Sequence, residues 1–132
     1  MTAASRLSAA RLLLVDDDPD IAELMALFLR RRVAELWIAH DGMEGLELWR
    51  QHRPDVVVTD QMMPQMSGME MARLIRAEAP EAAIVLTSAA EADEVRGAEV
   101  DQWVPKPVDL AQLIAAIESV LDGCAAADPA VV

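Results

Sequence analysis

The sequence predicts an α/β fold, a doubly wound parallel sheet with helices on both faces. The first observation is that short apolar runs of strand length alternate along the chain with segments of helical periodicity. The second is that these runs are almost wholly apolar, as expected for strands buried on both faces. The third is the length of 132 residues, which suits one domain with a proper core. Five strands at this size predict the flavodoxin-like strand order 2-1-3-4-5.

The first predicted strand, residues 12–15, is the apolar run Leu-Leu-Leu-Val, and it stops at three consecutive aspartates. Pro19 suits the first turn of the following helix, and Asp18 suits its N-cap. Apolar residues at i, i+3, i+4 and i+7 predict the buried face of this helix: Ile21, Leu24, Met25 and Phe28. A second strand is predicted over residues 33–39, with two interruptions in its apolar run.

The next two elements lead to the centre of the predicted sheet. Asp41 and Glu44 have capping-box spacing, which predicts the start of a second helix. The third strand, residues 56–58, is the β-branched run Val-Val-Val, and Thr59 and Asp60 follow it. An acid at the end of a buried strand costs free energy unless a partner compensates it. Such positions are typical of carboxylates that have a catalytic or binding role.

The remaining elements alternate in the same way. A third helix begins at the capping-box pair Ser67 and Glu70 and runs to residue 78. Beyond it the pattern predicts, in order, a strand, a short acidic helix, a strand and a last helix: residues 83–86, 90–97, 100–104 and 110–121. Gly123 is expected to close the last helix.

These elements define one domain over residues 11–122, with tails over 1–10 and 123–132 that lack a clear period. No apolar run approaches the roughly 20 residues of a membrane span. The single cysteine, Cys124, cannot form an internal disulfide and fits a reducing cytoplasm. The net charge of −12 argues against nucleic-acid binding, which needs a basic face. We therefore expect a cytoplasmic protein with no direct contact to membrane or nucleic acid.

Polar residues gather where the predicted strands end. Asp16 and Asp17 follow the first strand, and Asp60 follows the apolar run of the third. Thr87 follows the fourth strand, and Lys106, the only lysine of the chain, follows the fifth. In the order 2-1-3-4-5 the first and third strands are neighbours at the switch point, where ligands bind beyond the carboxyl ends. Three acids, one hydroxyl and one ammonium are therefore expected on one rim.

This set of groups favours phosphoryl chemistry. Two carboxylates about 4 Å apart repel by roughly 4 kcal/mol at an effective dielectric of 20, so three together need a cation. Mg²⁺ suits them because it takes hard oxygen ligands and commonly joins one or two carboxylates to a phosphate oxygen. Asp60 could then act as a nucleophile that forms an aspartyl phosphate. Lys106 would supply a counter-charge, and Thr87 a hydrogen bond.

At these residues the chain resembles the receiver domain of two-component response regulators. The segment LLLVDDDPDI is similar to the acidic end of that family's first strand. PDVVVTDQMMPQMSG is similar to its phosphoacceptor strand and loop, with Asp-x-x-Met-Pro-x-x-x-Gly at Asp60 to Gly68. IVLTS is similar to its strand 4 threonine segment, and WVPKPVDL to its lysine-proline turn. The resemblance covers about residues 10–122.

The resemblance implies a metal-dependent phosphoacceptor. Asp60 would be the phosphorylated residue and also a metal ligand. Asp16 and Asp17 would be the acidic pair for Mg²⁺, or Mn²⁺ in its place, with Asp17 as the more direct ligand. The backbone carbonyl of Met62 would complete the ligands that the protein supplies.

The resemblance also implies the roles of the other rim residues and of the partners. Thr87 would bond a phosphoryl oxygen, and Lys106 would form the ion pair. A sensor histidine kinase or a phosphotransfer protein would donate the phosphoryl group from its phosphohistidine. Such a receiver is not an enzyme with turnover, because it catalyses only its own phosphorylation and slow dephosphorylation. No output domain is recognisable after Leu121, so we expect a stand-alone receiver or one excised from a longer regulator.

Two features depart from the family pattern. Trp103 stands where the family usually has a smaller aromatic residue that moves inward with Thr87, which leaves open whether Trp103 serves as the switch. Only 19 positions separate Thr87 from Lys106, about one helical turn fewer than expected. The fourth helix should therefore be short or irregular. That helix, the fifth strand and the last helix form the family's signalling face, where we expect a downstream protein partner.

Two other functions stay open. Haloacid dehalogenase-like phosphatases also use a strand-end aspartate and Mg²⁺, in the motif Asp-x-Asp-x-Thr/Val. Asp16 and Asp18 fit its first two places, but Asp20 fills the last, and the length leaves no room for a cap domain. The alternative is a receiver-like binding module that works without phosphorylation. The complete set of rim residues argues against it, and the short fourth helix favours it.

Overall fold

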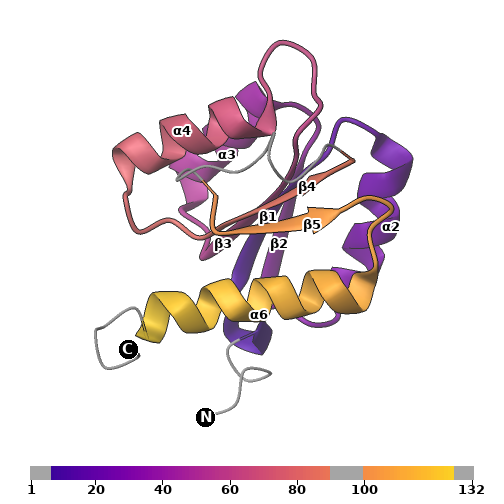
Figure 1. Cartoon of the computed structure of the whole chain (residues 1–132), viewed down its shortest axis with the longest axis vertical. Helices are drawn as coiled ribbons and strands as arrows, with labels where there is room; N and C mark the ends of the chain where they lie inside the picture. The colour runs from indigo at the N-terminus through magenta and orange to yellow at the C-terminus, as the bar shows by residue number, and fades with distance from the viewer. Residues whose placement is uncertain (1–6, 90–99, 127–132) are drawn as a thin grey trace.

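The computed structural model describes residues 7–89 and 100–126, which form a parallel sheet with the strand order β2-β1-β3-β4-β5 (Figure 1). The five strands are β1 (Arg11–Val15), β2 (Glu35–Ala39), β3 (Val56–Asp60), β4 (Ile84–Ser88) and β5 (Gln102–Pro105). Every neighbouring pair is parallel. The predicted order 2-1-3-4-5 is confirmed. The predicted fourth helix, residues 90–97, lies outside the described residues.

Helices cover the sheet on both faces (Figure 1). Among the described residues these helices are α2 (Pro19–Arg30), α3 (Gly42–His52), α4 (Gly68–Glu78) and α6 (Leu110–Ala126). On one face α2 and α6 pack against alternate strand residues such as Leu12 and Val58. On the other face α3 and α4 pack against the residues between them, such as Leu13 and Val57. Both sides of each central strand are thus buried, which explains why the sequence shows continuous apolar runs.

The predicted helix starts are present as side-chain caps. Asp18 accepts hydrogen bonds from the backbone N–H groups of Asp20 and Ile21, at 3.0 and 3.3 Å. At α4 the predicted capping box is complete, because Ser67 and Glu70 each accept a bond from the other's backbone N–H. These bonds satisfy N–H groups that have no partner within the helix.

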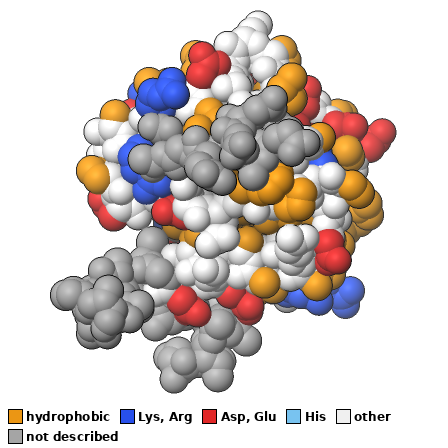
Figure 2. Space-filling view, in the orientation of Figure 1, with side chains coloured by type: hydrophobic (Ala, Val, Ile, Leu, Met, Phe, Trp, Pro, Cys, Tyr) orange, Lys and Arg blue, Asp and Glu red, His pale blue; other side chains and the backbone are white. Residues whose placement is uncertain are grey.

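The buried face of α2 matches the predicted one only in part, at Met25 and at Phe28, which is partly buried against the core. The helix buries four residues, of which only Met25 was predicted: Ala22, Met25, Ala26 and Leu29. Leu24 is 65% exposed, and hydrophobic side chains are visible at the surface where Figure 1 places α2 (Figure 2). The physical reason is that Ala22 and Ala26 let the helix backbone approach the sheet closely. A count of large apolar residues overlooks such small contact residues.

Several predicted boundaries also shift. β4 includes Thr87 and Ser88, which were expected to end it, because both pair with β5. α6 continues through Gly123 to Ala126, beyond its expected end. Residues 1–10 were predicted as a tail, yet Leu7 is buried in the core that α2 and α6 share. The hydrophobic core therefore includes a residue that precedes the first strand.

The rotated face of α2 gives a stability test. We expect Leu29→Ala to lower the free energy of unfolding by about 2–5 kcal/mol. The Leu29 side chain is 0% exposed, so its removal leaves a cavity in the core. Leu24→Ala, the same substitution on the predicted face, should change it by less than about 0.5 kcal/mol. Urea denaturation of both variants measures the difference. Equal losses of stability in the two variants would contradict the observed buried face and support the predicted one.

Candidate functional site

The carboxyl ends of β1 and β3 bring three carboxylates together. The two strands pair in parallel with Val15 opposite Thr59, so an aspartate follows on each at the same level. One carboxylate oxygen each of Asp16, Asp17 and Asp60 lies within 4.8 Å of the others. Asp16 and Asp60 are only 3% and 4% exposed, whereas Asp17 is open to solvent. The acids predicted from two separate strand ends thus form one cluster.

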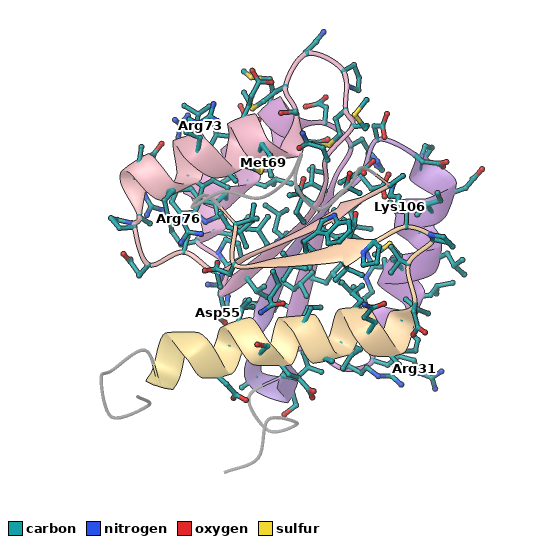
Figure 3. All side chains as sticks on the ribbon, in the orientation of Figure 1. Arg31, Asp55, Met69, Arg73, Arg76 and Lys106 are labelled. Carbon is teal, nitrogen blue, oxygen red and sulfur yellow. The ribbon has the colours of Figure 1, made fainter. Side chains whose placement is uncertain are left out.

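Lys106 supplies the positive charge of this cluster. Its Nζ lies 3.0 Å from Oδ1 of Asp60, and its side chain is mostly buried. The backbone N–H of Lys106 donates to the carbonyl of Ser88 at 3.0 Å, which continues the β4–β5 ladder past the end of β5. The strand therefore aims the ammonium group at the carboxylates. Figure 3 labels Lys106 at this end of β5.

Thr87 lies beside Asp60 on the neighbouring strand. The two residues are opposite each other in the β3–β4 register, and Thr87 is buried. Its hydroxyl donates to the carbonyl of Thr59 at 3.5 Å, which is long for a hydrogen bond of this kind. The hydroxyl is thus near the carboxylates and only weakly held.

Burial and like charge together raise the pKa of Asp16 above its ordinary value of 3.8. Loss of hydration on burial is the largest cause, and the charges of Asp60 and Asp17 raise the pKa further. A hydrogen bond of 2.9 Å from the backbone N–H of Asp18 and the charge of Lys106 act in the opposite direction. The charge of Lys106 is thus insufficient to offset the effect of burial on the pKa of Asp16.

The carboxylate cluster fits a divalent cation. Three carboxylates offer only oxygen donors, and two of them are buried with a single ammonium among the described residues for compensation. Hard cations such as Mg²⁺ prefer this donor set. Among the described residues no histidine or cysteine joins the cluster, so softer metals find no nitrogen or sulfur ligand there.

The loop after β3 carries another predicted ligand. The side chain of Met62 is 73% exposed, and the role of its backbone carbonyl stays a prediction. At the far end of the loop, Gly68 packs directly against the backbone carbonyl of Asp60. A Cβ at this position would collide with that carbonyl, which explains the glycine at the start of α4.

Gln61 contributes contacts that the sequence did not reveal. It follows Asp60 and bonds to three other residues of this region through its backbone and its side-chain amide. A polar residue after a strand is usual in any loop, so its type alone carries no signal.

Trp103 is half-buried on β5, opposite Leu86 in the register. Its indole N–H is buried and has no hydrogen-bond partner among the described residues. An unsatisfied buried donor costs about 1–3 kcal/mol. Whether this residue acts as a switch stays a prediction.

A cavity of about 620 Å³ lies at the other end of the sheet. Its lining includes Ala10, Asp55 and Ala83, each of which precedes a strand, together with Trp49 and Arg53. None of the predicted site residues lines it. The cavity is therefore separate from the carboxylate cluster.

Comparison with known proteins identifies relatives of the whole domain. The family model described as "Response regulator receiver domain" matches residues 12–118. The DNA-binding response regulator MtrA of Mycolicibacterium smegmatis is 35% identical over 112 residues, which are 83% of this chain and 49% of MtrA. The probable transcriptional regulatory protein TcrX of Mycobacterium tuberculosis is 34% identical over 83% of this chain and 48% of its own. This chain thus spans about half the length of the curated relatives it matches.

Solved structures agree with these relatives. The response regulator TrrA of Thermotoga maritima, solved in complex with Mg²⁺ and BeF, is similar with a TM-score of 0.76 and 30% identity. The similarity covers 83% of this chain and 97% of TrrA. A receiver domain protein of Clostridium thermocellum is similar with a TM-score of 0.80 and 27% identity, over 86% of this chain and 94% of its own.

One expectation about surroundings is wrong and another stays open. Absence of a direct nucleic-acid partner was expected from the net charge, but the relative MtrA is named as DNA-binding. The charge describes only the half of such a protein that this chain matches, so it cannot exclude DNA contact elsewhere.

Among the helices of residues 7–89 and 100–126, none is long and apolar enough to cross a membrane. A cytoplasmic location stays a prediction.

The raised pKa of Asp16 predicts the pH dependence of stability without divalent metal. Between 3.8 and the raised pKa, the folded state binds more protons than the unfolded state at Asp16, so stability falls as the pH rises. Asp16→Asn should therefore raise the free energy of unfolding at pH 7, because the amide carries no charge whose burial costs free energy. The gain should shrink as the pH falls towards 3.8. Urea denaturation with a chelator measures it, and a gain that is constant across this range would contradict the prediction.

Proposed function

Because this chain belongs to the response regulator receiver domain family, we propose that Asp60 accepts a phosphoryl group from a phosphohistidine. The donor would be a sensor histidine kinase or a phosphotransfer protein. The observation that carries the proposal is the buried Asp60 carboxylate, with Lys106 at 3.0 Å and two further acids beside it. This combination supplies a nucleophile and the charges that a phosphoryl group needs.

The transfer itself exchanges one bond for another. A carboxylate oxygen of Asp60 attacks the phosphorus, and the bond from phosphorus to the donor's imidazole nitrogen breaks. The imidazole leaves with the electron pair of that bond and takes up a proton, while Asp60 becomes an acyl phosphate. Hydrolysis by water later restores the carboxylate and releases phosphate. The only group that is phosphorylated and dephosphorylated in this cycle is therefore Asp60 of the chain itself.

Lys106 and Thr87 would assist at the phosphoryl oxygens. The ammonium group of Lys106 has three donors, so it can hold Asp60 and also neutralise a phosphoryl oxygen. The Thr87 hydroxyl has only a 3.5 Å bond to lose before it can turn to the same group. Thr87 lies within β4, and Lys106 directly follows β5 with its backbone N–H bonded to Ser88 of β4, so the sheet positions both residues and lowers the cost of assembling the site.

Asp16, Asp17, Asp60 and the backbone carbonyl of Met62 would hold Mg²⁺. When bound, Mg²⁺ would neutralise negative charge on the phosphoryl group and among the carboxylates. Mn²⁺ takes the same oxygen donors and is proposed as a substitute. The similarity to TrrA, whose structure is titled as a complex with Mg²⁺ and BeF, supports this assignment.

Phosphorylation would switch the surface through Thr87 and Trp103. If Thr87 turns towards the phosphoryl group, the space beside β4 and β5 changes. The indole N–H of Trp103, which has no hydrogen-bond partner among residues 7–89 and 100–126, supports a second state, because a rearrangement that gives this donor a partner lowers its cost. The relatives MtrA and TcrX support a role in transcription for a longer protein that carries this domain.

The two alternatives have less support. A phosphatase of the haloacid dehalogenase type would need Asp18 at the reaction centre, but the Asp18 side chain caps α2. A binding module without phosphorylation would not need a buried ion pair at Asp60. Incubation with acetyl phosphate and Mg²⁺ separates the three functions. A receiver gains one phosphoryl group, a phosphatase releases phosphate repeatedly, and a binding module does neither.

Asp60→Asn should abolish phosphorylation, because the amide cannot form an acyl phosphate. The measurement is mass spectrometry of the intact protein after incubation with acetyl phosphate and Mg²⁺. The matched control is Asp55→Asn at the opposite end of β3, which should be phosphorylated like the wild type. Undiminished labelling of the Asp60 variant would refute the assignment.

Lys106→Ala should keep some phosphorylation but lose the conformational response. We expect the labelling rate to fall on the order of 100-fold, because one of the charges that stabilise the phosphoryl group is removed. Trp103 fluorescence in a background of Trp37→Phe and Trp49→Phe should no longer change on phosphorylation. Lys106→Arg, which keeps the charge, serves as the control. A normal fluorescence change in the alanine variant would contradict the role of Lys106.

A further inference from the structure

Gln61 joins the end of β3 to two other parts of the site. Its backbone N–H donates to the carbonyl of Thr87 at 3.0 Å, one step past the last strand pair. Its carbonyl accepts from the N–H of Gly68 at 3.0 Å. Its side-chain oxygen Oε1 accepts from the N–H of Met69 at 2.9 Å. All three bonds begin at the residue directly after Asp60.

Two of these bonds complete the start of α4. The first N–H groups of a helix have no partner within the helix and must find one elsewhere. In α4 the N–H of Glu70 is satisfied by the Ser67 hydroxyl, as in an ordinary capping box. The N–H groups of Gly68 and Met69 are satisfied by Gln61 instead. The helix start is therefore held to the sheet by a residue that lies outside the helix. Figure 3 labels Met69 at this start of α4.

The same bonds close the loop that carries Met62. Residues 62–67 leave the end of β3 and return to it. The segment begins directly after Gln61, and the two residues that follow it, Gly68 and Met69, are hydrogen-bonded to Gln61. Gly68 packs against the Asp60 carbonyl and closes the loop on its inner side. Gln65 has a φ of 70°, so the loop also holds one residue in the left-handed region. Such a loop keeps its shape only while its ends are held.

We infer that Gln61 is a positioning residue of the phosphoacceptor site, whose side-chain amide holds the start of α4 against β3 and so fixes the loop of Met62. This inference rests on the proposed function, in which the Met62 carbonyl and Asp60 hold Mg²⁺. Without the side-chain bond, the loop has more conformations available, and binding of the cation must select one of them. The consequence is weaker cation binding rather than a changed nucleophile.

The test compares Gln61→Met with Ser67→Ala. Methionine keeps the approximate size of glutamine but offers no oxygen to Met69, whereas Ser67→Ala removes a cap bond of the same helix that does not reach β3. Mg²⁺ binding is measured by calorimetry without a phosphodonor. Gln61→Met should weaken binding roughly fivefold, the equivalent of one hydrogen bond, and Ser67→Ala should change it less than about twofold.

Amide hydrogen exchange supplies a readout that does not depend on Mg²⁺. Exchange at Met69 should be faster in Gln61→Met and should return to the wild-type rate in Gln61→Glu, because a carboxylate oxygen can accept the same bond. Unchanged Mg²⁺ binding in Gln61→Met would overturn the inference, and so would equal weakening in both variants. A third outcome separates the two proposals. If the variants differ in Mg²⁺ binding as expected but the wild-type protein gains no phosphoryl group, the proposed function is overturned and the positioning role of Gln61 stands.

Discussion

The burial of two carboxylates beside a third is the constraint on which this molecule depends. Asp16 and Asp60 are withdrawn from water, and within the described part of the chain the ammonium group that compensates them is that of Lys106, which pairs with Asp60. Replacement of either acid by an apolar residue would relieve the repulsion, as buried charges are costly wherever they are incompletely paired. The fold instead keeps the acids together, which is understandable if a divalent cation completes the balance of charge.

The parallel sheet brings these residues together from distant parts of the sequence. β3 lies between β1 and β4, so the end of each neighbour is within reach of Asp60. Two hydrogen-bonded extensions carry the order of the sheet beyond its strands: Gln61 bonds to Thr87, and Lys106 bonds to Ser88. The reactive groups thus inherit the rigidity of the sheet although several of them stand in loops.

Much of this arrangement follows from the sequence. Apolar runs located the strands because both faces of the sheet are covered, and strand ends located Asp60 and Lys106 because parallel strands end at one edge. The face of α2 could not be predicted in the same way, since Ala22 and Ala26 contribute by being small. The bonds of Gln61 also escaped prediction, because they depend on how the loop returns in space. Net charge misled about nucleic acid, since this chain matches only about half of a relative that is named as DNA-binding.

β5 is an edge strand of four residues, paired only with β4 among the described strands, and Lys106 follows it directly. Edge strands open more readily than central ones, because they have hydrogen bonds on one side only. An opening of β5 would withdraw the sole lysine from Asp60 while the central strands stay paired. Under the proposed function, the reactivity of Asp60 would then depend on the pairing of this edge strand, and a partner bound to β5 would change that reactivity from outside the acidic cluster.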